Sequence, residues 1–334
     1  MSGTIVITES EVHELLTMRE CIDVMEDVIA ALERGEVYQP LRQIARAPGA
    51  EGLLGMMPGY RGGQSPVYGL KEVCVFPGNP ARGLDTHLGT VLLHSGDTGE
   101  LLAIASASAI TAIRTAAVSA LATRLLARED STTLAIIGAG VQAHAHMRSI
   151  PLVRSIREIR ICSRTRKSAE GLAAASAAGE RGVPPIVTVR VTGTVEEAVR
   201  DADIIVTATS SRDPVLRAGW VAAGTHINAV GSSIAAAREL DGATVGAASL
   251  FVDRRESTVN ESGDYLFALR EGAIAEGHIR AEIGEVLLGK APGRRSRDEI
   301  TLFKSLGLAA EDLASVAFLY AKASRLGVGT KVDL

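Results

Sequence analysis

A glycine-rich turn is the segment whose residue types and spacing point most directly to chemistry. The run GAGVQA follows an apolar run at 134–137 and opens a helical pattern at 141–147. Glycines there allow a tight turn and let the backbone approach a pyrophosphate at the N-terminal end of the helix. A tight turn without a ligand is the alternative, but the flanking strand and helix favour a dinucleotide site. The turn residues assigned to the dinucleotide are Gly138, Gly140, Val141, Gln142 and Ala143.

The end of the second predicted strand, at Cys162, indicates which dinucleotide is preferred. NAD sites carry Asp or Glu about 20 residues beyond the turn, where the carboxylate binds the ribose 2′-hydroxyl. Here Ser163, Arg164 and Thr165 follow the strand, and the first carboxylate is Glu170. Arg164 can bind a 2′-phosphate, and the two hydroxyls can donate hydrogen bonds to it. We therefore expect NADP(H) to be preferred, with NAD(H) as the alternative; without a ligand, these residues would be a solvated basic helix start.

Two later apolar strands end in small and polar residues. In a parallel sheet, side chains at the carboxyl ends of such strands contact the nicotinamide half of the cofactor. The residues expected there are Thr207, Ala208 and Thr209 after one strand, and Val230, Gly231 and Ser232 after the next.

Basic side chains within apolar segments are candidates for binding an anionic substrate. Arg114 interrupts a stretch of small apolar residues, where an unpaired cation would be costly. A structural salt bridge is the alternative for it. Lys71 lies in an apolar strand and could hold a carboxylate or donate a proton.

The remaining titratable groups are weaker candidates. His87 and His94 fall on opposite faces of a predicted strand, so we expect no metal site. His146 follows the glycine turn and is expected to face solvent or to pack, and Asp264 is expected in a polar loop.

Composition and charge define the class of protein that positions these residues. The 334 residues predict about two domains, and 46% apolar residues with 34 glycines are typical of α/β enzymes. With 1 Trp, 5 Tyr and 5 Phe, the chain lacks the aromatics of a stacking surface, and a formal charge of −4 argues against nucleic acid. Cys21, Cys74 and Cys162 are far apart, which indicates reduced thiols in a cytoplasmic protein.

We expect neither a secretion signal nor a membrane-spanning helix in this sequence. The first 16 residues lack a basic segment followed by an apolar run. The most apolar stretch, 101–122, contains Arg114 and is predicted to be a buried helix or a pair of segments. We therefore expect a soluble cytoplasmic protein without a membrane partner.

Two domains follow from the hydrophobic patterning. Residues 1–120 predict an α+β domain, which begins with one helix capped at Thr8 and continues with an antiparallel sheet near 53–58, 67–76 and 88–93. Residues 121–304 alternate between apolar strands and helices, including a helix from Ser168 to Gly179. This alternation predicts a Rossmann-type, doubly wound parallel sheet.

The C-terminal tail has a separate pattern. From residue 301 onward it predicts a long helix, and the segment 305–334 is expected to return to and complete the first domain. The fold class is therefore α/β, with a Rossmann-type domain and an α+β substrate-binding and dimerisation domain.

Six segments carry a resemblance to a known family. Their order and spacing are similar, nearly end to end, to the ornithine cyclodeaminase/mu-crystallin family, and GAGVQA, Ser-Arg-Thr, GSS and AEIGEV are closest to its mu-crystallin branch of NADPH-dependent ketimine reductases. The segments are RTAAVSALATRLLA (114–127), IIGAGVQAHAH (136–146), HINAVGSS (226–233), ESGD (261–264), AEIGEVLLGK (281–290) and TLFKSLGLAAED (301–312).

The resemblance implies an assembly and a set of substrate-binding residues. It implies a homodimer joined through the N-terminal domain, and an active site in the cleft between domains. Arg42, Lys71 and Arg114 fall at the family's carboxylate-binding positions, with Lys71 and Arg114 catalytic. The positions of two cyclodeaminase carboxylates hold Gly55 and Ser233 here, and Ser233 is assigned to substrate binding.

The function implied is NAD(P)H-dependent reduction of cyclic ketimine carboxylates in amino-acid metabolism. Δ1-pyrroline-2-carboxylate would give L-proline, and Δ1-piperideine-2-carboxylate would give L-pipecolate. The alternatives are an alanine-type amino-acid dehydrogenase that needs ammonia, an ornithine cyclodeaminase, and a non-enzymatic, crystallin-like protein that binds a small ligand.

Overall fold

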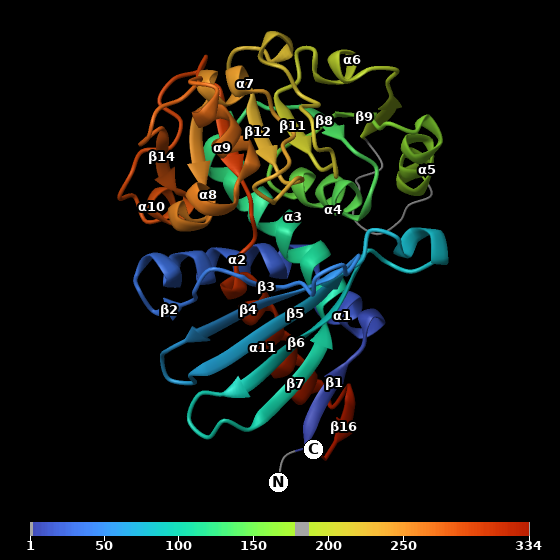
Figure 1. The fold of residues 1–334 in the computed structure, drawn as a ribbon, viewed down its shortest axis with the longest axis vertical. Coiled ribbons are helices and arrows are strands. Elements are labelled where there is room, and N and C mark those ends of the chain that lie inside the picture. Colours follow the sequence, from blue (N-terminus) through green and yellow to red (C-terminus); the bar gives the residue numbers. More distant parts are fainter. Residues whose placement is uncertain (1–2, 178–186, 334) are drawn as a thin grey trace. The chain divides into compact units, whose positions relative to one another are not determined.

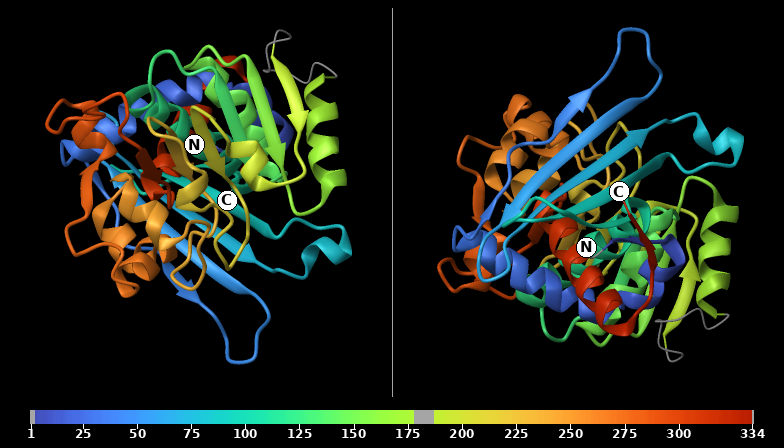
Figure 2. Two further views of the ribbon diagram at one scale, coloured as in Figure 1. Left: turned by 90° about the horizontal axis from the view of Figure 1, so that it is seen from above. Right: turned by 90° about the horizontal axis from the view of Figure 1, so that it is seen from below.

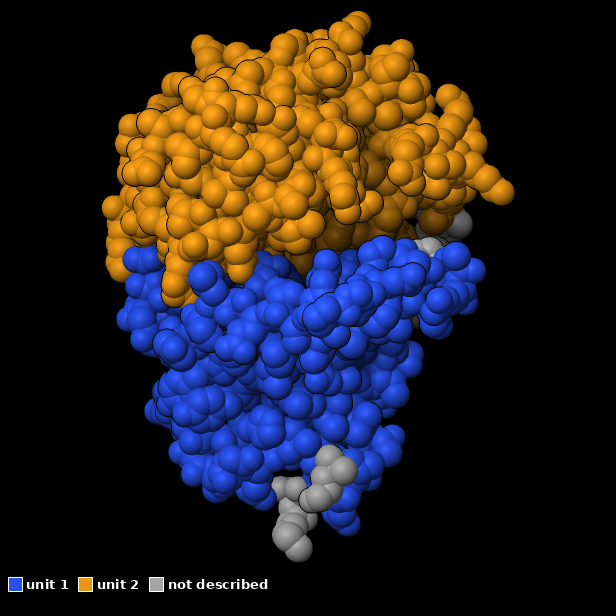
Figure 3. All heavy atoms as spheres, viewed as in Figure 1, with its two compact units in different colours: residues 1–114, 307–334 blue, residues 115–306 orange. Residues whose placement is uncertain are grey.

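The chain folds into two compact units. The structure, a computed structural model, describes residues 3–177 and 187–333 (Figure 1). Unit 1 comprises Met1–Arg114 and Gly307–Leu334, and unit 2 comprises Thr115–Leu306 (Figure 3). The divisions at 114/115 and 306/307 compare with 120/121 and 304/305 predicted from the sequence.

Unit 1 begins with two helices, where the sequence analysis predicted one. Helix α1 (Glu9–Leu15) starts at Thr8, which forms the expected capping box with Glu11. Helix α2 (Met18–Glu33) has a second capping box, in which Thr17 and Glu20 satisfy each other's backbone N–H groups. The single-helix prediction was wrong because the apolar pattern continues across a residue that caps a new helix.

A mixed sheet forms the body of unit 1. Among the described residues its strand order is β16-β1-β7-β6-β5-β4-β2, with β3 paired to β4. The pairing is antiparallel, as predicted, except that β1 and β7 run parallel. The strands are β1 (Thr4–Ile7), β2 (Val37–Tyr38), β3 (Gln43–Ala45), β4 (Leu53–Arg61), β5 (Val67–Val75), β6 (His87–Ser95), β7 (Leu101–Ser106) and β16 (Thr330–Val332).

Helix α11 (Ala309–Leu326) covers one face of this sheet and lies beside α2 (Figure 2). Gly69 makes the close approach possible, because a Cβ there would lie 2.6 Å from Leu313 Cδ1. The helix ends at Gly327, whose φ of +67° is left-handed, and the chain then forms β16. The prediction of one helical segment over 305–334 was therefore wrong at both ends.

The sheet of unit 2 is doubly wound and parallel, as predicted. Within the described residues its order is β10-β9-β8-β11-β12-β15-β13-β14. The chain runs outward from β8 through β9 to β10 and then returns to β11, so the order reverses at β8 and β11, where such sheets bind ligands. The strands are β8 (Thr133–Ile137), β9 (Glu158–Cys162), β10 (Thr188–Val191), β11 (Ile204–Thr207), β12 (His226–Ala229), β13 (Ser249–Val252), β14 (Ile279–Glu282) and β15 (Thr301–Lys304).

Strand β15 corrects the prediction of a helix from residue 301. All four of its residues are buried, and it pairs with β12 and β13 inside the sheet. A strand of four buried residues is too short to be distinguished from a helix start by periodicity alone. The helices of unit 2 include α4 (Val141–Ser149), α5 (Arg166–Ala177), α6 (Val195–Val199), α7 (Gly242–Ala247), α8 (Arg255–Glu261), α9 (Gly263–Arg270) and α10 (Ile283–Leu287). Gly179, the predicted end of α5, lies outside the described residues.

Helix α3 (Ala107–Leu126) crosses the division between the units. Its length and composition would suit a membrane span, but 83% of its most apolar 18-residue window is buried inside the protein. Its C-terminal carbonyl groups accept hydrogen bonds from arginines. Arg154 donates to the oxygens of Arg124 and Ala127, and Arg294 donates to that of Leu126. These bonds satisfy carbonyls that have no partner within the helix.

Candidate active site

Two cations and two carboxylates form a buried cluster in unit 1. Asp312 Oδ1 lies 3.2 Å from Lys71 Nζ and 3.1 Å from Arg114 Nε, so one carboxylate bridges both cations. Arg114 also donates to Glu311 Oε2 at 2.7 Å, and Lys71 donates to Thr111 Oγ1 at 2.6 Å. None of the four charged residues is more than 5% exposed. Strand β5 supplies the lysine, α3 the arginine and α11 both acids.

The cluster confirms the burial of both cations and contains the salt bridge considered for Arg114. Glu311 and Asp312 were not among the residues predicted from the sequence. The only available signal was an acidic pair inside the otherwise apolar run 306–316. A buried acidic pair in such a run requires cations opposite it.

Burial sets the acidity of Lys71. The pKa of its ammonium group is lowered from 10.5 to about 8, mainly because the group is removed from water; Asp312 opposes this shift and Arg114 adds to it. Lys71 is therefore charged near neutral pH but loses its proton more easily than an exposed lysine.

We expect carboxylate binding at this cluster to weaken as the pH rises through about 8, because Lys71 then loses its charge. In the unfolded chain Lys71 keeps its proton up to a pH of about 10.5. The free energy of unfolding should therefore rise between pH about 8 and about 10.5, where the unfolded chain binds this proton and the folded protein does not. Inhibition by cyclopentanecarboxylate, whose charge is constant in this range, measures the binding. Lys71→Arg, which stays charged, should remove the pH dependence. If it persists in that variant, another group causes it.

The other substrate-binding candidates lie in different parts of the chain. Arg42 is half-buried directly before β3, and Ser233 is half-buried in the loop that follows β12 in unit 2. Gly55 is buried in β4, opposite Val73 of β5. Of the substrate-binding candidates, Lys71 and Arg114 are brought together by their shared contact with Asp312, and the roles of Arg42 and Ser233 stay predictions.

The glycine turn of unit 2 has the backbone that a dinucleotide requires. Gly138 has a φ of +122°, and a Cβ there would lie 2.4 Å from the carbonyl oxygen of Ala208. Gly140 is the N-cap of α4 without a side-chain cap, and a Cβ there would meet no atom within 4 Å. The first turn of α4 is thus accessible to an anion. Val141 is 64% exposed, and Ala143 packs in the core. These residues fit a dinucleotide pyrophosphate.

The segment between β9 and α5 is exposed. Ser163 is half-buried, and Arg164 and Thr165 are exposed before α5 begins at Arg166. The position of the acidic residue of an NAD site is thus held by a basic side chain with access to solvent.

The ends of β11 and β12 are joined by backbone hydrogen bonds. The amide of Val230 donates to Thr207 O at 2.9 Å, and that of Ser232 donates to Thr209 O at 3.2 Å. Ser232 has a φ of 50°, which is uncommon for a residue other than glycine. The buried carboxylate of Glu239, which the sequence analysis missed, contacts both strand ends.

Two titratable residues differ from simple surface groups. His146 is fully buried, with a ring nitrogen 2.9 Å from Ser119 Oγ, and burial lowers the pKa of its imidazole to about 4. Of the two possibilities predicted from the sequence, facing solvent or packing, His146 therefore packs inside the protein. Asp264, expected in a polar loop, is instead buried in α9. In the described residues no group of three potential metal ligands occurs.

The fold and the turn define a Rossmann-type dinucleotide-binding protein with a second, α+β unit. The chain belongs to the ornithine cyclodeaminase/mu-crystallin family, whose model matches residues 3–326.

Relatives cover most or all of the chain. Ketimine reductase mu-crystallin of Mus musculus is 40% identical over 86% of this chain and 85% of its own. The structure of Thermococcus litoralis Δ1-pyrroline-2-carboxylate reductase with NADH and L-proline has a TM-score of 0.94 and 38% identity, covering 98% of this chain and 100% of that one. An archaeal alanine dehydrogenase dimer with bound NAD has a TM-score of 0.91 and 33% identity, covering 99% of each chain.

Proposed function

We propose that this protein is an oxidoreductase that reduces the C=N bond of cyclic ketimine carboxylates with a nicotinamide dinucleotide. Δ1-pyrroline-2-carboxylate and Δ1-piperideine-2-carboxylate are the substrates, and L-proline and L-pipecolate are the products. The buried Lys71–Arg114 pair, bridged by Asp312, is the observation that carries the proposal, because it offers a fixed carboxylate anchor. The reductase relatives and the glycine turn support it.

The anchor determines which atom of the substrate is presented for reduction. Lys71 and Arg114 bind the carboxylate, and this fixes C2, the adjacent carbon that gains hydrogen. A bound reduced nicotinamide supplies the hydride. A protonated iminium is already electrophilic at C2, so Lys71 needs only to keep a proton near the ring nitrogen. Holding the substrate in one orientation lowers the activation free energy by several kcal/mol, on the order of 7 kcal/mol for well-aligned groups.

The residues that would hold the dinucleotide come from three parts of unit 2. The turn from Gly138 to Ala143 binds the pyrophosphate, and the ends of β11 and β12 bind the nicotinamide ribose. Arg164, with Ser163 and Thr165, binds a 2′-phosphate, and this favours NADPH over NADH. The two solved relatives hold NADH and NAD, so the preference requires a direct test.

We expect the unmodified protein to use NADPH at least about tenfold better than NADH, since one charge-assisted contact contributes about 1.4 kcal/mol. Arg164→Asp should abolish or reverse this preference, because a carboxylate repels the 2′-phosphate and accepts from a 2′-hydroxyl. The measurement is kcat/KM for each cofactor. Arg166→Asp, which changes a neighbouring exposed arginine, is the matched control. Equal use of both cofactors by the unmodified protein would refute the role of Arg164.

A substrate panel tests the proposed reaction against its alternatives. NADPH oxidation should be fast with five- and six-membered ketimines and slow with pyruvate plus ammonia, the reaction of an alanine dehydrogenase. Ornithine with NAD or NADP should release neither proline nor ammonia. Gly55 and Ser233 cannot accept a proton from an ammonium group, as a cyclodeaminase requires. Comparable turnover of ornithine would contradict the proposal, and ligand binding without any turnover would favour a crystallin-like protein.

A homodimer through unit 1 is also part of the proposal. The sheet face opposite α11 exposes apolar side chains: Tyr68 is 52% and Leu88 is 42% exposed, and Leu70, Leu92 and Ile104 are half-buried. The latter three are opposite one another across β5, β6 and β7. Contiguous apolar surface of this kind marks an interface. Sedimentation should give twice the mass of the 334-residue chain, and Leu92→Glu should give the monomer; a monomeric unmodified protein would refute the dimer.

A further inference from the structure

The carboxylate of Glu239 joins the ends of two neighbouring strands in unit 2. Its oxygens accept hydrogen bonds from Thr207 Oγ1 at 2.7 Å, from the amide of Thr209 at 2.6 Å and from the amide of Gly231 at 2.8 Å. Glu239 is fully buried. Thr207 is the last residue of β11, Thr209 follows β11, and Gly231 follows β12; these two strands are adjacent in the sheet (Figure 1). One side chain therefore fixes the distance between these two strand ends.

A buried lysine and a second carboxylate complete the network. Lys304, at the end of β15, donates to the carbonyl oxygen of Gly231 at 2.8 Å and lies 2.9 Å from Asp264 Oδ2. Asp264 Oδ1 accepts from the amides of Glu239 and Leu240, at 2.8 and 2.9 Å. Gly231 is thus held on both sides, its amide by Glu239 and its carbonyl by Lys304.

The backbone that this network holds is unfavourable without it. At Gly231 a Cβ would lie 2.1 Å from the carbonyl oxygen of Thr209, so the two segments are in close contact. The next residue, Ser232, has a φ of 50°. Such conformations persist where the surroundings determine them, and they concentrate at ligand sites.

Stability alone gives a weak reason for three buried charges. Burial raises the pKa of the Glu239 carboxyl, and Asp264 adds to this effect, whereas Lys304 opposes it. A well-packed apolar cluster of the same volume is often at least as stable as such a network. The network fixes the backbone geometry at the carboxyl ends of β11 and β12, which an apolar cluster would not do.

We propose that Glu239 is a positioning residue for the nicotinamide half of the dinucleotide. It holds the segments at Thr207–Thr209 and Gly231–Ser232 at the separation that the nicotinamide ribose requires. Lys304, which donates to the carbonyl of Gly231, and Asp264, which accepts from the amide of Glu239, fix the backbone around it. The inference rests on the proposed function, because it takes these two segments as part of the cofactor site. The pyrophosphate turn at Gly138 makes none of these contacts with Glu239.

Comparison of a dinucleotide with its own fragment tests this role. Glu239→Gln replaces one acceptor oxygen by an NH2 group, which meets an N–H donor and breaks that bond. Calorimetric titration gives Kd for the preferred reduced cofactor and for the same molecule without the nicotinamide and its ribose, which is 2′-phospho-ADP for NADPH or ADP for NADH. The variant should bind the cofactor about tenfold more weakly, the cost of one charge-assisted hydrogen bond, and the fragment within about twofold of the unmodified protein.

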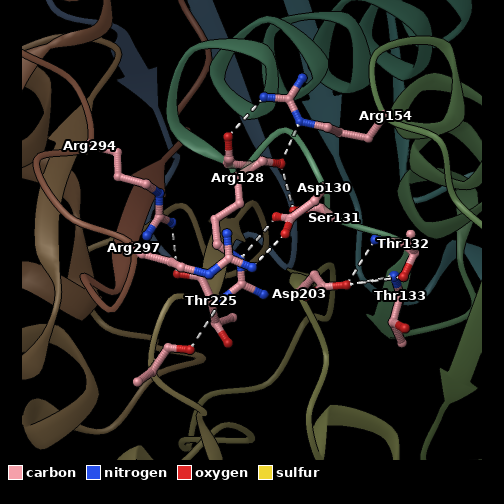
Figure 4. Close-up of polar contacts among 12 residues, drawn as sticks. Arg128, Asp130, Ser131, Thr132, Thr133, Arg154, Asp203, Thr225, Arg294 and Arg297 are labelled. Carbon is pink, nitrogen blue, oxygen red and sulfur yellow. Dashed lines mark hydrogen bonds and ion pairs between the residues drawn. The ribbon is translucent and has the colours of Figure 1, made fainter.

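Asp203→Asn is the matched control, because Asp203 lies at the amino ends of the strands of the same sheet, away from Glu239. Asp203 precedes β11 and accepts from the amides of Thr132 and Thr133, at 2.8 and 3.0 Å, and from Arg128 (Figure 4). This variant should lower the melting temperature and leave the ratio of the two Kd values unchanged. If Glu239→Gln does not fold, Thr207→Val takes its place, because it removes one hydrogen bond to Glu239 and keeps the charge of the carboxylate. It should weaken cofactor binding about threefold and leave fragment binding unchanged.

The outcomes separate this inference from the proposed function. Equal weakening of cofactor and fragment by Glu239→Gln, or no weakening of either, overturns the positioning role while ketimine reduction by the unmodified protein stands. An unmodified protein that binds neither NADPH nor NADH overturns the proposed function and this inference together.

Discussion

Arg114→Lys should lower kcat/KM for a cyclic ketimine carboxylate by about 100-fold while the protein stays folded. A lysine keeps the charge beside Glu311 and Asp312, but it cannot present the planar guanidinium that binds two carboxylates and a substrate in fixed directions. The loss of about 2–5 kcal/mol expected for a desolvated carboxylate contact sets the scale. Dinucleotide affinity, followed by fluorescence titration, should not change.

Arg114→Ala should in addition lower the free energy of unfolding. It removes a guanidinium that contacts two buried acids, and breaking a buried ion pair costs about 3–5 kcal/mol. Arg61→Lys is a matched control in unit 1, because Arg61 pairs with Asp27 at the surface, 2.6 Å away. Normal ketimine reduction by Arg114→Lys would show that Arg114 only supports the fold.

Gly138→Ala should abolish measurable dinucleotide binding at micromolar protein. The added Cβ would lie 2.4 Å from the carbonyl oxygen of Ala208, at a φ of +122° that side chains rarely adopt. The turn must move to relieve this contact, and its amides then no longer converge on the pyrophosphate. Isothermal titration with NADPH and NADH measures the effect.

Gly171→Ala is the control for Gly138→Ala. Gly171 lies within α5, and a Cβ there would meet no atom within 4 Å, so alanine should leave binding intact and stabilise the helix by about 0.5–1 kcal/mol. Unmodified affinity in Gly138→Ala would show that the turn is structural and that the dinucleotide is bound elsewhere.

The parts of the fold that could be predicted from the sequence depend on local patterns. The strand, glycine turn and helix around Gly138 occupy consecutive residues, so their types and spacing sufficed. The capping box at Thr8 and the three predicted strands of unit 1, which correspond to β4, β5 and β6, are local in the same sense. Lys71 and Arg114 stood out because a cation in an apolar run is costly without a partner.

The residues that the sequence analysis missed depend on contacts between distant segments. Lys71 and Asp312 are 241 residues apart, so the acid that bridges the two cations is found only when α11 packs on β5. Glu239 likewise contacts Thr207, 32 residues earlier. Strand β15 was mistaken for a helix start because four buried residues show no period, and its place between β12 and β13 is a property of the whole sheet.

Transfer of deuterium to the product is the most direct test of ketimine reduction. Δ1-pyrroline-2-carboxylate is incubated with NADPH or NADH that carries deuterium at the transferable C4 position, and the product is analysed by mass spectrometry and NMR. We expect L-proline with one deuterium at C2 for each dinucleotide oxidised. Proline without deuterium, or dinucleotide oxidation without proline, would contradict the proposed reaction.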